Sequence, residues 1–355
     1  MSDATVSDAV FTGVQLTTLT PPSIDEVAKL ISSMPAKSSP MDAFPTSVMK
    51  SCVDVFSPLI ARLAALSFSD GVFPKRYKTA SVTPLLKKKG LDGDNVANYR
   101  PISNLHTVSK IVERLFLSRI IAHVEQAPCF NRLQSAYRRG HSTETALLRL
   151  TNDIYMAADN KSRTLLVQLD LSAAFDTIDS ATLFKRLQRS FGLSGVALSW
   201  IRSYIEDRQQ FIRLGSFQSD ATICRYGVPQ GSVLGPLFFS HYIAPVADVI
   251  SLLNVQHTQY ADDTQLYIAM KGASSLTVMN DCFNAVHRWF TINGLALNPD
   301  KSEAIVVGTG ARQRREGDIG TVALGGNDIP VPGVNLNKVG AKVTHHAEKY
   351  VSLSS

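Results

Sequence analysis

The chain has 355 residues, of which 45% are hydrophobic and 19% charged, and its formal net charge is +6. This composition is typical of a globular protein with a sizeable core, and it excludes a low-complexity or fibrous chain. The four cysteines contain no CxxC pair, which excludes a zinc ribbon and a disulfide scaffold as interpretations. The first residues lack the basic and apolar regions of a signal peptide, so we expect an intracellular protein, in the nucleus or cytoplasm and not secreted.

Positive charge is concentrated in one part of the sequence. Residues 71–150 contain fourteen Lys and Arg against five Asp and Glu, so this segment carries +9, more than the whole chain. A solvated basic face and a nucleic-acid-binding surface explain such a segment about equally well. The most apolar stretch, residues 233–255, is interrupted by two prolines, a histidine and an aspartate. It therefore predicts buried core and not a membrane span, and no membrane is expected as a partner.

In the first half of the chain, apolar spacing predicts mainly helices. Residues 1–20 show no clear periodicity and are expected to be a loose leader. Ser23 and Glu26 form a Ser-x-x-Glu capping box, which is typical of a helix start. The apolar residues that follow, at 24, 27, 30 and 31, have helical spacing. Further helices are predicted over residues 57–67, over 108–124 and around 147–154, with a short strand over 80–86.

The second half mixes strands and helices. An apolar run at residues 165–169 predicts a buried strand, and residues 259–270 predict a β-hairpin with acids at its tip. Helices are predicted over 180–189 and around 276–290, where apolar residues are spaced 3-4-3-4 before Gly294, and a strand over 304–307. These elements together predict an α+β fold with antiparallel strands. Residues 311–355 show no pattern and are expected to be a divergent, disordered tail.

Two groups of acids stand out. Asp170 ends the apolar run 165–169, and Asp262 and Asp263 are adjacent at the expected hairpin tip, none of them with Lys or Arg beside it. Adjacent carboxylates repel one another, which costs stability unless a cation neutralises them. Mg²⁺ binds oxygen ligands and shares its coordination between a few carboxylates and substrate phosphates. Nucleotidyl transfer needs such ions. By themselves, however, the adjacent acids are more often explained by an ordinary hairpin turn, and an acid after an apolar strand is a common turn or cap residue.

Five sequence blocks carry a family resemblance. Residues 98–105 (NYRPISNL) resemble the fingers block of non-LTR retrotransposon reverse transcriptases, and residues 134–146 (QSAYRRGHSTETA) resemble the next block of that family. Residues 170–176 (DLSAAFD), 226–236 (YGVPQGSVLGP) and 260–263 (YADD) are similar to polymerase motifs A, B and C. In all, six or more blocks follow the family's order over about residues 25–307. The residues in these blocks are most similar to those of CR1/L2-type elements, with Jockey-like elements as a near alternative.

The resemblance implies an RNA-directed DNA polymerase that copies an RNA template from a DNA primer with dNTPs. Its cofactor would be Mg²⁺, with Mn²⁺ as an alternative. A ring at Phe175 would leave no room for a 2′-hydroxyl, although core packing is the other explanation. Lys301 would give a proton to pyrophosphate, unless it is only a solvated turn lysine. By motif position, the implied catalytic residues are Asp170, Asp262, Asp263 and Lys301; the metal ligands Asp170, Leu171, Asp262 and Asp263; the dNTP-binding residues Arg100, Phe175, Gln230, Gly231 and Lys88; and the nucleic-acid-binding residues Arg138 and Arg139.

The implied architecture is the right-hand polymerase fold, with an antiparallel palm sheet packed on helices. A fingers-rich part is expected over about residues 21–160 and a palm-rich part over about 161–310. Residues 334–340 depart from the family's pattern, so the thumb is expected to be missing, and the upstream endonuclease is expected to be missing as well. An alternative function is therefore a truncated, catalytically inactive nucleic-acid-binding remnant. The sequence leaves the oligomeric state open.

Overall fold

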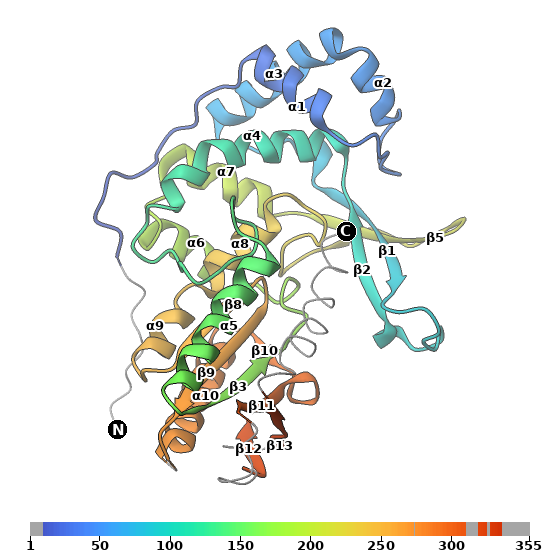
Figure 1. Cartoon of the computed structure of the whole chain (residues 1–355). Helices are drawn as coiled ribbons and strands as arrows, with labels where there is room; N and C mark the ends of the chain where they lie inside the picture. The colour runs from blue at the N-terminus through green and yellow to red at the C-terminus, as the bar shows by residue number, and fades with distance from the viewer. Residues whose placement is uncertain (1–9, 273, 310–318, 325–326, 336–355) are drawn as a thin grey trace. The chain divides into compact units, whose positions relative to one another are not determined.

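The computed structural model describes residues 10–272, 274–309, 319–324 and 327–335, and these residues form two compact units. Unit 1 contains the described residues of 131–174 and 243–335, and unit 2 contains residues 10–130 and 175–242. Each unit is therefore assembled from segments that are far apart in the sequence. Both units contain helices and antiparallel strand pairs (Figure 1), which confirms the predicted α+β class.

The centre of unit 1 is a five-stranded sheet in the order β14-β11-β3-β9-β8. Its middle strand, β3 (Arg163–Leu169), is antiparallel to both β11 (Glu303–Gly308) and β9 (Asp263–Met270). β9 continues to β8 (Gln256–Tyr260) as an antiparallel hairpin, and β14 (Gly333–Asn335) lies parallel to β11. Six of the seven residues of β3 are buried. A strand covered on both faces reads as a continuous apolar run, which is why the pattern of residues 165–169 predicted it.

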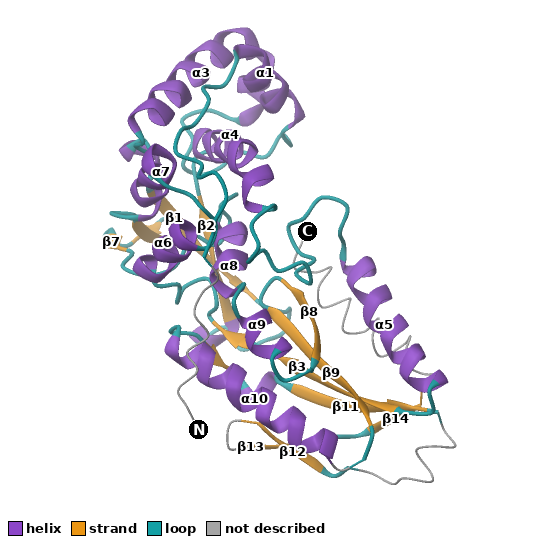
Figure 2. Ribbon diagram, turned by 90° about the vertical axis from the view of Figure 1, so that its left-hand side faces the viewer, coloured by secondary structure: helices purple, strands orange, loops and turns teal. Residues whose placement is uncertain are grey.

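Helices α5 (Thr143–Asp159) and α10 (Ser274–Ile292) lie on opposite sides of this sheet (Figure 2). Leu150 and Ile154 of α5 pack against Leu166 and Tyr267, which are partners in the β3–β9 register. Helix α10 buries Met279, Phe283, Val286 and Phe290 of its predicted apolar stripe and contacts β9. The other elements of unit 1 are α9 (Val246–Ser251), β4 (Leu171–Ser172), β10 (Ala296–Leu297), the 3-10 turn η3 (Pro299–Lys301), β12 (Thr321–Leu324) and β13 (Asn327–Pro330).

An aromatic cluster around Trp200 forms the core of unit 2. Trp200 lies in α7 (Gly195–Ile205), and its ring is stacked on Phe116, with centroids 3.9 Å apart. Its indole N–H donates to the hydroxyl of Ser67 at 2.8 Å, so the one polar atom of this buried ring is satisfied. The helices of unit 2 are α1 (Ile24–Ser33), α2 (Thr46–Ser51), α3 (Val53–Asp70), α4 (Thr107–Val124), α6 (Ser180–Arg189), α7 and α8 (Gly235–Ile243).

Unit 2 also has a sheet of its own, in the order β2-β1-β5-β6, with β7 paired to β5. Strand β1 (Thr79–Leu86) is antiparallel to β2 (Tyr99–Asn104) and parallel to β5 (Gln209–Leu214). The short strands β6 (Phe217–Gln218) and β7 (Thr222–Ile223) complete it, and 3-10 turns η1 (Lys75–Tyr77) and η2 (Val96–Asn98) flank β1 and β2. The sequence predicted only β1, because the other strands lack the apolar alternation of a half-buried strand.

Residues 10–20 correct the expectation of a loose leader. The backbone N–H of Phe11 donates to the carbonyl of Arg189 at 2.7 Å, and Leu16 forms a parallel bridge with Leu193. Leu19 is buried. This segment is therefore docked on the loop between α6 and α7, because its few apolar side chains gain burial there. Residues 1–9 lie outside the described part of the chain.

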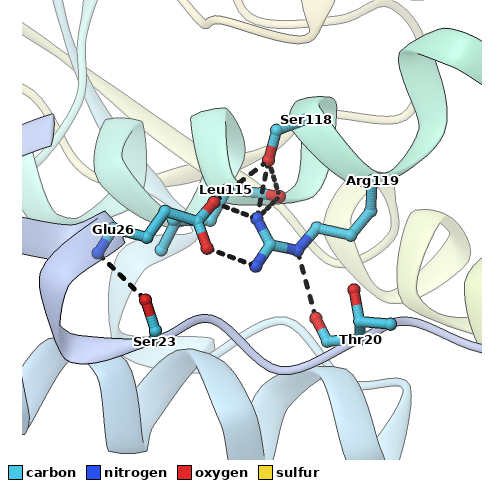
Figure 3. Close-up of polar contacts among 6 residues, drawn as sticks. All are labelled: Thr20, Ser23, Glu26, Leu115, Ser118 and Arg119. Atoms are coloured by element: carbon cyan, nitrogen blue, oxygen red, sulfur yellow. Dashed lines mark hydrogen bonds and ion pairs between the residues drawn. The ribbon is translucent and has the colours of Figure 1, made fainter.

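The start of α1 also differs in detail from the prediction. The hydroxyl of Ser23 accepts the backbone N–H of Glu26 at 3.1 Å, as a capping box requires. The carboxylate of Glu26, however, accepts from both terminal nitrogens of Arg119 in α4 (Figure 3). These hydrogen bonds hold the pKa of Glu26 below its usual value. A bidentate charged pair is stronger than a neutral cap bond, so Glu26 joins α1 to α4 instead.

The described part of residues 311–355 corrects the expectation of a disordered tail. It contains β12, β13 and β14, and Val322, Ile329 and Val334 are buried. These apolar residues are spaced too irregularly to be recognised as strands, but they find partners in unit 1. The rest of the predicted tail lies outside the described residues.

The expectation of buried core for residues 233–255 is confirmed. This stretch contains α8 and α9, where Phe238, Phe239 and Ile250 are fully buried. Across the part of the chain that the structure describes, no helix is long and apolar enough to cross a membrane. None of the four cysteines, all of which lie in the described part of the chain, forms a disulfide.

Candidate active site

The three predicted catalytic acids lie at one end of the unit 1 sheet. The β3–β9 register ends with Leu169 opposite Thr264, so Asp170 and Asp263 are the next residues at the same end of neighbouring strands. β8 and β9 are joined by a two-residue turn, Ala261 and Asp262. The hairpin with acids at its tip is therefore confirmed as a structure. All three acids are half-buried.

Lys301 lies beside Asp170. Its ammonium nitrogen is 3.6 Å from Oδ2 of Asp170, and the lysine side chain is largely exposed. The backbone of Asp170 is held by the same segment: its carbonyl accepts from Asn298 N at 2.8 Å, and its N–H donates to Ser302 Oγ at 3.4 Å. The expectation that these acids have no cationic neighbour is therefore wrong for Asp170. The sequence could not show it, because β10 and η3 bring Lys301 back from a distant part of the chain.

The loop at residues 131–139 lies near the turn of the β8–β9 hairpin. Desolvation, together with the charge on Asp262, raises the pKa of Tyr137 to about 12, although 54% of this residue remains exposed. The guanidinium of Arg138 donates to the carbonyls of Arg132 and Gln134, each at 3.0 Å, and so helps to close the loop. Arg139 is exposed. A role of Arg138 and Arg139 in nucleic-acid binding stays a prediction.

In unit 2, the structure brings the block at residues 98–105 onto motif B. The backbone N–H of Ser103 in β2 donates to the carbonyl of Gln230 at 2.8 Å. Gly231 has a φ of 112°, and a Cβ at this position would be 2.7 Å from the carbonyl oxygen of Ser103. Only glycine fits both the backbone conformation and this close approach. Arg100 lies on the same strand, opposite Leu85 of β1.

Phe175 is also joined to motif B within unit 2. Its carbonyl accepts from Val228 N at 2.9 Å, and its half-buried ring lies 5.0 Å from the ring of Phe239. The Nε2 atom of Gln230 donates to Oδ2 of Asp176 at 2.8 Å. Desolvation raises the pKa of Asp176, although much of the residue is accessible, and the bond from Gln230 opposes this rise.

Comparison with known proteins identifies the family of this chain. Residues 86–336 match the family of reverse transcriptases (RNA-dependent DNA polymerases). The chain belongs to the reverse transcriptase family. The resemblance to non-LTR retrotransposon reverse transcriptases, drawn from the sequence blocks, is thereby confirmed.

The similar proteins include polymerases of mobile elements. The chain is 27% identical over 340 residues to the RNA-directed DNA polymerase from mobile element jockey of Drosophila melanogaster, covering 93% of this chain and 35% of that protein. It is 30% identical over 266 residues to the probable RNA-directed DNA polymerase from transposon BS of the same species, covering 73% and 29%. A Pol polyprotein from the type-1 retrotransposable element R2 of Popillia japonica is 29% identical over 240 residues, covering 64% and 32%. The chain thus spans about a third of the length of these relatives.

Within this reverse transcriptase domain, the sequence did not indicate that Glu113 is a buried connection between two segments. It is fully buried in α4, and its carboxylate accepts from Val233 N at 2.7 Å, Leu234 N at 3.3 Å and Ser109 Oγ at 2.9 Å. A carboxylate before the first turn of α8 is favoured by the exposed N–H groups of a helix start. The sequence feature that could have indicated Glu113 is the presence of an acid among the apolar residues of the predicted helix 108–124.

Leu171 and Lys88 are the other two predicted site residues. Leu171 is buried in β4, opposite Leu297 of β10. Lys88 is exposed in the loop between β1 and β2. It lies three residues after Leu85, which is paired with Arg100 in the β1–β2 register. Neither position contradicts the predicted role, and neither shows it.

The acids of unit 1 suit an ion shared with substrate. Among the described residues, no set of three or more His, Cys, Asp or Glu side chains lies close enough together to enclose a metal. Oδ2 of Asp170 is buried and has no hydrogen-bond partner within the described part of the chain. Mg²⁺ usually takes one or two carboxylates together with substrate phosphates. The residues therefore fit Mg²⁺ bound in that way, and they do not fit an all-protein cage.

Proposed function

We propose that this reverse transcriptase domain extends a DNA primer along an RNA template, by two-metal nucleotidyl transfer from dNTPs. The observation that carries the proposal is the position of Asp170, Asp262 and Asp263 at one end of neighbouring strands. The family match over residues 86–336 supports it, as do relatives named RNA-directed DNA polymerases. In this proposal the sheet of unit 1 is the palm, and the β1–β2 hairpin belongs to the fingers.

We assign Mg²⁺ binding to Asp170 and Asp262, with Asp263 as a supporting acid and the Leu171 carbonyl as a further ligand. Bound Mg²⁺, or Mn²⁺, would favour ionisation of the primer 3′-hydroxyl and neutralise charge on the phosphates. The 3′-hydroxyl gives its proton to solvent water, its oxygen forms a bond to the α-phosphorus, and the bond from the α-phosphorus to the bridging oxygen breaks. Lys301 gives its proton to the departing pyrophosphate, a role consistent with an exposed ammonium 3.6 Å from Asp170.

We assign nucleotide selection to residues of unit 2. The ring of Phe175 excludes a 2′-hydroxyl, and its contact with Phe239 supports a fixed orientation of that ring. Gln230 and Gly231 contribute to binding the dNTP, while Arg100 and Lys88 bind its triphosphate. The bond from Ser103 to Gln230 is consistent with this division, since it links the strand of Arg100 to motif B. Arg138 and Arg139 are assigned to template phosphates.

Asp262→Asn tests the proposal, because it removes charge and almost no volume. We expect primer extension on an RNA template to fall at least about a hundredfold, since metal-held charge is lost from the transition state. The melting temperature should stay equal or rise, because repulsion between adjacent carboxylates is relieved. Asp281→Asn, at an exposed position of α10, is the control and should leave extension unchanged.

Two outcomes would count against the assignment. Extension by the Asp262→Asn protein at the parent rate would remove Asp262 from the chemistry. A parent chain that binds RNA–DNA hybrid but extends no primer under Mg²⁺ or Mn²⁺ would favour the alternative of a catalytically inactive nucleic-acid-binding remnant.

A further inference from the structure

The turn that carries Asp262 has an unfavourable backbone. Ala261, its first residue, has a φ of 55°, in the left-handed region that residues with a Cβ rarely adopt. Ala261 is only 8% exposed. A strained residue persists only when the surrounding structure holds it in place. Because Asp262 is the next residue, whatever holds Ala261 also sets the direction of the Asp262 carboxylate.

Gln134 holds Ala261 through two hydrogen bonds. Its Oε1 accepts from the backbone N–H of Ala261 at 2.9 Å, and its Nε2 donates to the carbonyl of Ala261 at 3.0 Å. The side chain is only 3% exposed. A backbone N–H can only donate and a carbonyl can only accept, so this pair of bonds needs an amide. A carboxylate of the same shape would face the Ala261 carbonyl with an oxygen.

Gln134 is itself held firmly against the outer edge of β8. Ser135 N donates to the carbonyl of Gln259 at 2.9 Å, and Gln259 N donates to the carbonyl of Leu133 at 3.0 Å. The Oε1 atom of Gln134 also accepts from Ala136 N at 3.1 Å. The Nδ2 atom of Asn131 donates to Oε1 of Gln259, so a second side chain fastens the same segment to β8 without contacting the turn.

We propose that Gln134 is a positioning residue for Asp262, which acts by fixing the Ala261 backbone in its left-handed conformation. The inference rests on the proposed function, because it gives Asp262 a catalytic task. It also goes beyond that function, because Gln134 contacts neither metal nor substrate in the proposed mechanism. Loss of the amide lets the turn relax, and the carboxylate of Asp262 then spends less time in the productive direction.

Three variants distinguish a role of Gln134 in positioning Asp262 from a general role in attaching its loop to β8. Gln134→Ala removes both bonds to Ala261, and Gln134→Glu keeps the shape but not the donor. Asn131→Ala is the matched control, because it weakens the attachment of the same loop to β8 and leaves both Ala261 bonds in place. We expect both Gln134 variants to lower kcat roughly tenfold to a hundredfold at equal folded fraction. KM for dNTP should stay within about a factor of two, and Asn131→Ala should keep parental kcat.

Two measurements do not depend on catalysis. Amide hydrogen exchange in a peptide spanning Tyr260 to Thr264 should be faster in both Gln134 variants than in the Asn131 control. Mn²⁺ affinity, measured from the free-ion signal in electron paramagnetic resonance, should weaken in the same variants. Ala261→Gly, added to Gln134→Ala, should recover part of the lost kcat, because glycine adopts this φ without strain.

The outcomes distinguish the inference from the function on which it rests. Parental kcat and parental exchange in Gln134→Ala would overturn the inference, and so would an equal loss of kcat in Asn131→Ala. A parent chain that extends no primer would sink the proposed function instead. Exchange at the turn and Mn²⁺ affinity would then decide the role of Gln134 without any assay of polymerisation.

Discussion

The carboxylate of Glu113 in α4 accepts the backbone N–H of Val233 at 2.7 Å, in the part of motif B just before α8. The same carboxylate accepts from Leu234 N at 3.3 Å, and the residue is fully buried. Glu113 therefore connects the helix after the fingers block to the loop that contains Gln230 and Gly231 and leads into α8. The contact lies entirely within unit 2.

Glu113→Ala should lower the free energy of unfolding by about 2–4 kcal/mol, because it leaves two buried N–H groups without an acceptor. Glu113→Gln keeps one acceptor oxygen of the same shape and should cost less. Urea denaturation measures both. Glu206→Ala, at an exposed position, is the control and should change stability by less than about 0.5 kcal/mol. A loss no greater than that of the control would mean that these N–H groups find other partners.

Phe175→Ala should admit ribonucleotides, because it opens space where the 2′-hydroxyl of an incoming nucleotide would lie. The measurement is the ratio of kcat/KM for a dNTP to that for the matching rNTP, in parent and variant. Phe68→Leu is the control, since Phe68 is a buried ring that contacts Trp200 in the core of unit 2. This control should lower stability and keep the parental ratio. An unchanged ratio in Phe175→Ala would assign that ring to core packing alone.

Lys301 can be tested as a proton donor with two substitutions. Lys301→Arg keeps a positive charge near Asp170 but cannot release a proton at ordinary pH, while Lys301→Met removes both properties. If Lys301 is the general acid, both variants should lose roughly a hundredfold in kcat and lose the alkaline limb of the parental pH–rate profile. Parental kcat and an unchanged profile in Lys301→Arg would show that only the charge beside Asp170 matters.

The buried His257 in β8 should make folding sensitive to acid. It is 3% exposed, and burial, with a smaller contribution from nearby Arg149, lowers its pKa from 6.5 to about 4. Between pH 6.5 and pH 4 the unfolded chain therefore binds more protons at this position than the folded chain. Stability should fall as the pH is lowered through that window, by about 2 kcal/mol between pH 7 and pH 5.

His257→Gln removes this titration and provides the test. The difference in the free energy of unfolding between pH 7 and pH 5 should shrink by about 2 kcal/mol in this variant. His141→Gln, at an exposed position, should retain the parental difference. An equal pH dependence in parent and His257→Gln would mean that His257 is protonated at similar pH in both states.

The sequence by itself determined the elements whose patterns are local. Helix α6 has the predicted bounds. Strand β3 and the β8–β9 hairpin, with Asp262 and Asp263 at its tip, were also predicted. Periodicity and capping depend on residues a few positions apart, so they can be read without the fold. The family resemblance likewise followed from short blocks, because a block of consecutive residues keeps its order whatever its surroundings.

Only the tertiary structure decided which distant residues meet. The side chain of Gln134 reaches the backbone of Ala261, Glu113 reaches Val233, and Lys301 lies beside Asp170. The sequence also did not indicate the division into two units. Asp170 and Phe175 are five residues apart and yet belong to different units. Polar contacts of this kind leave no periodic signal. They are specified by strand order and by the need to satisfy each buried N–H and carbonyl group, which arises only when the chain is folded.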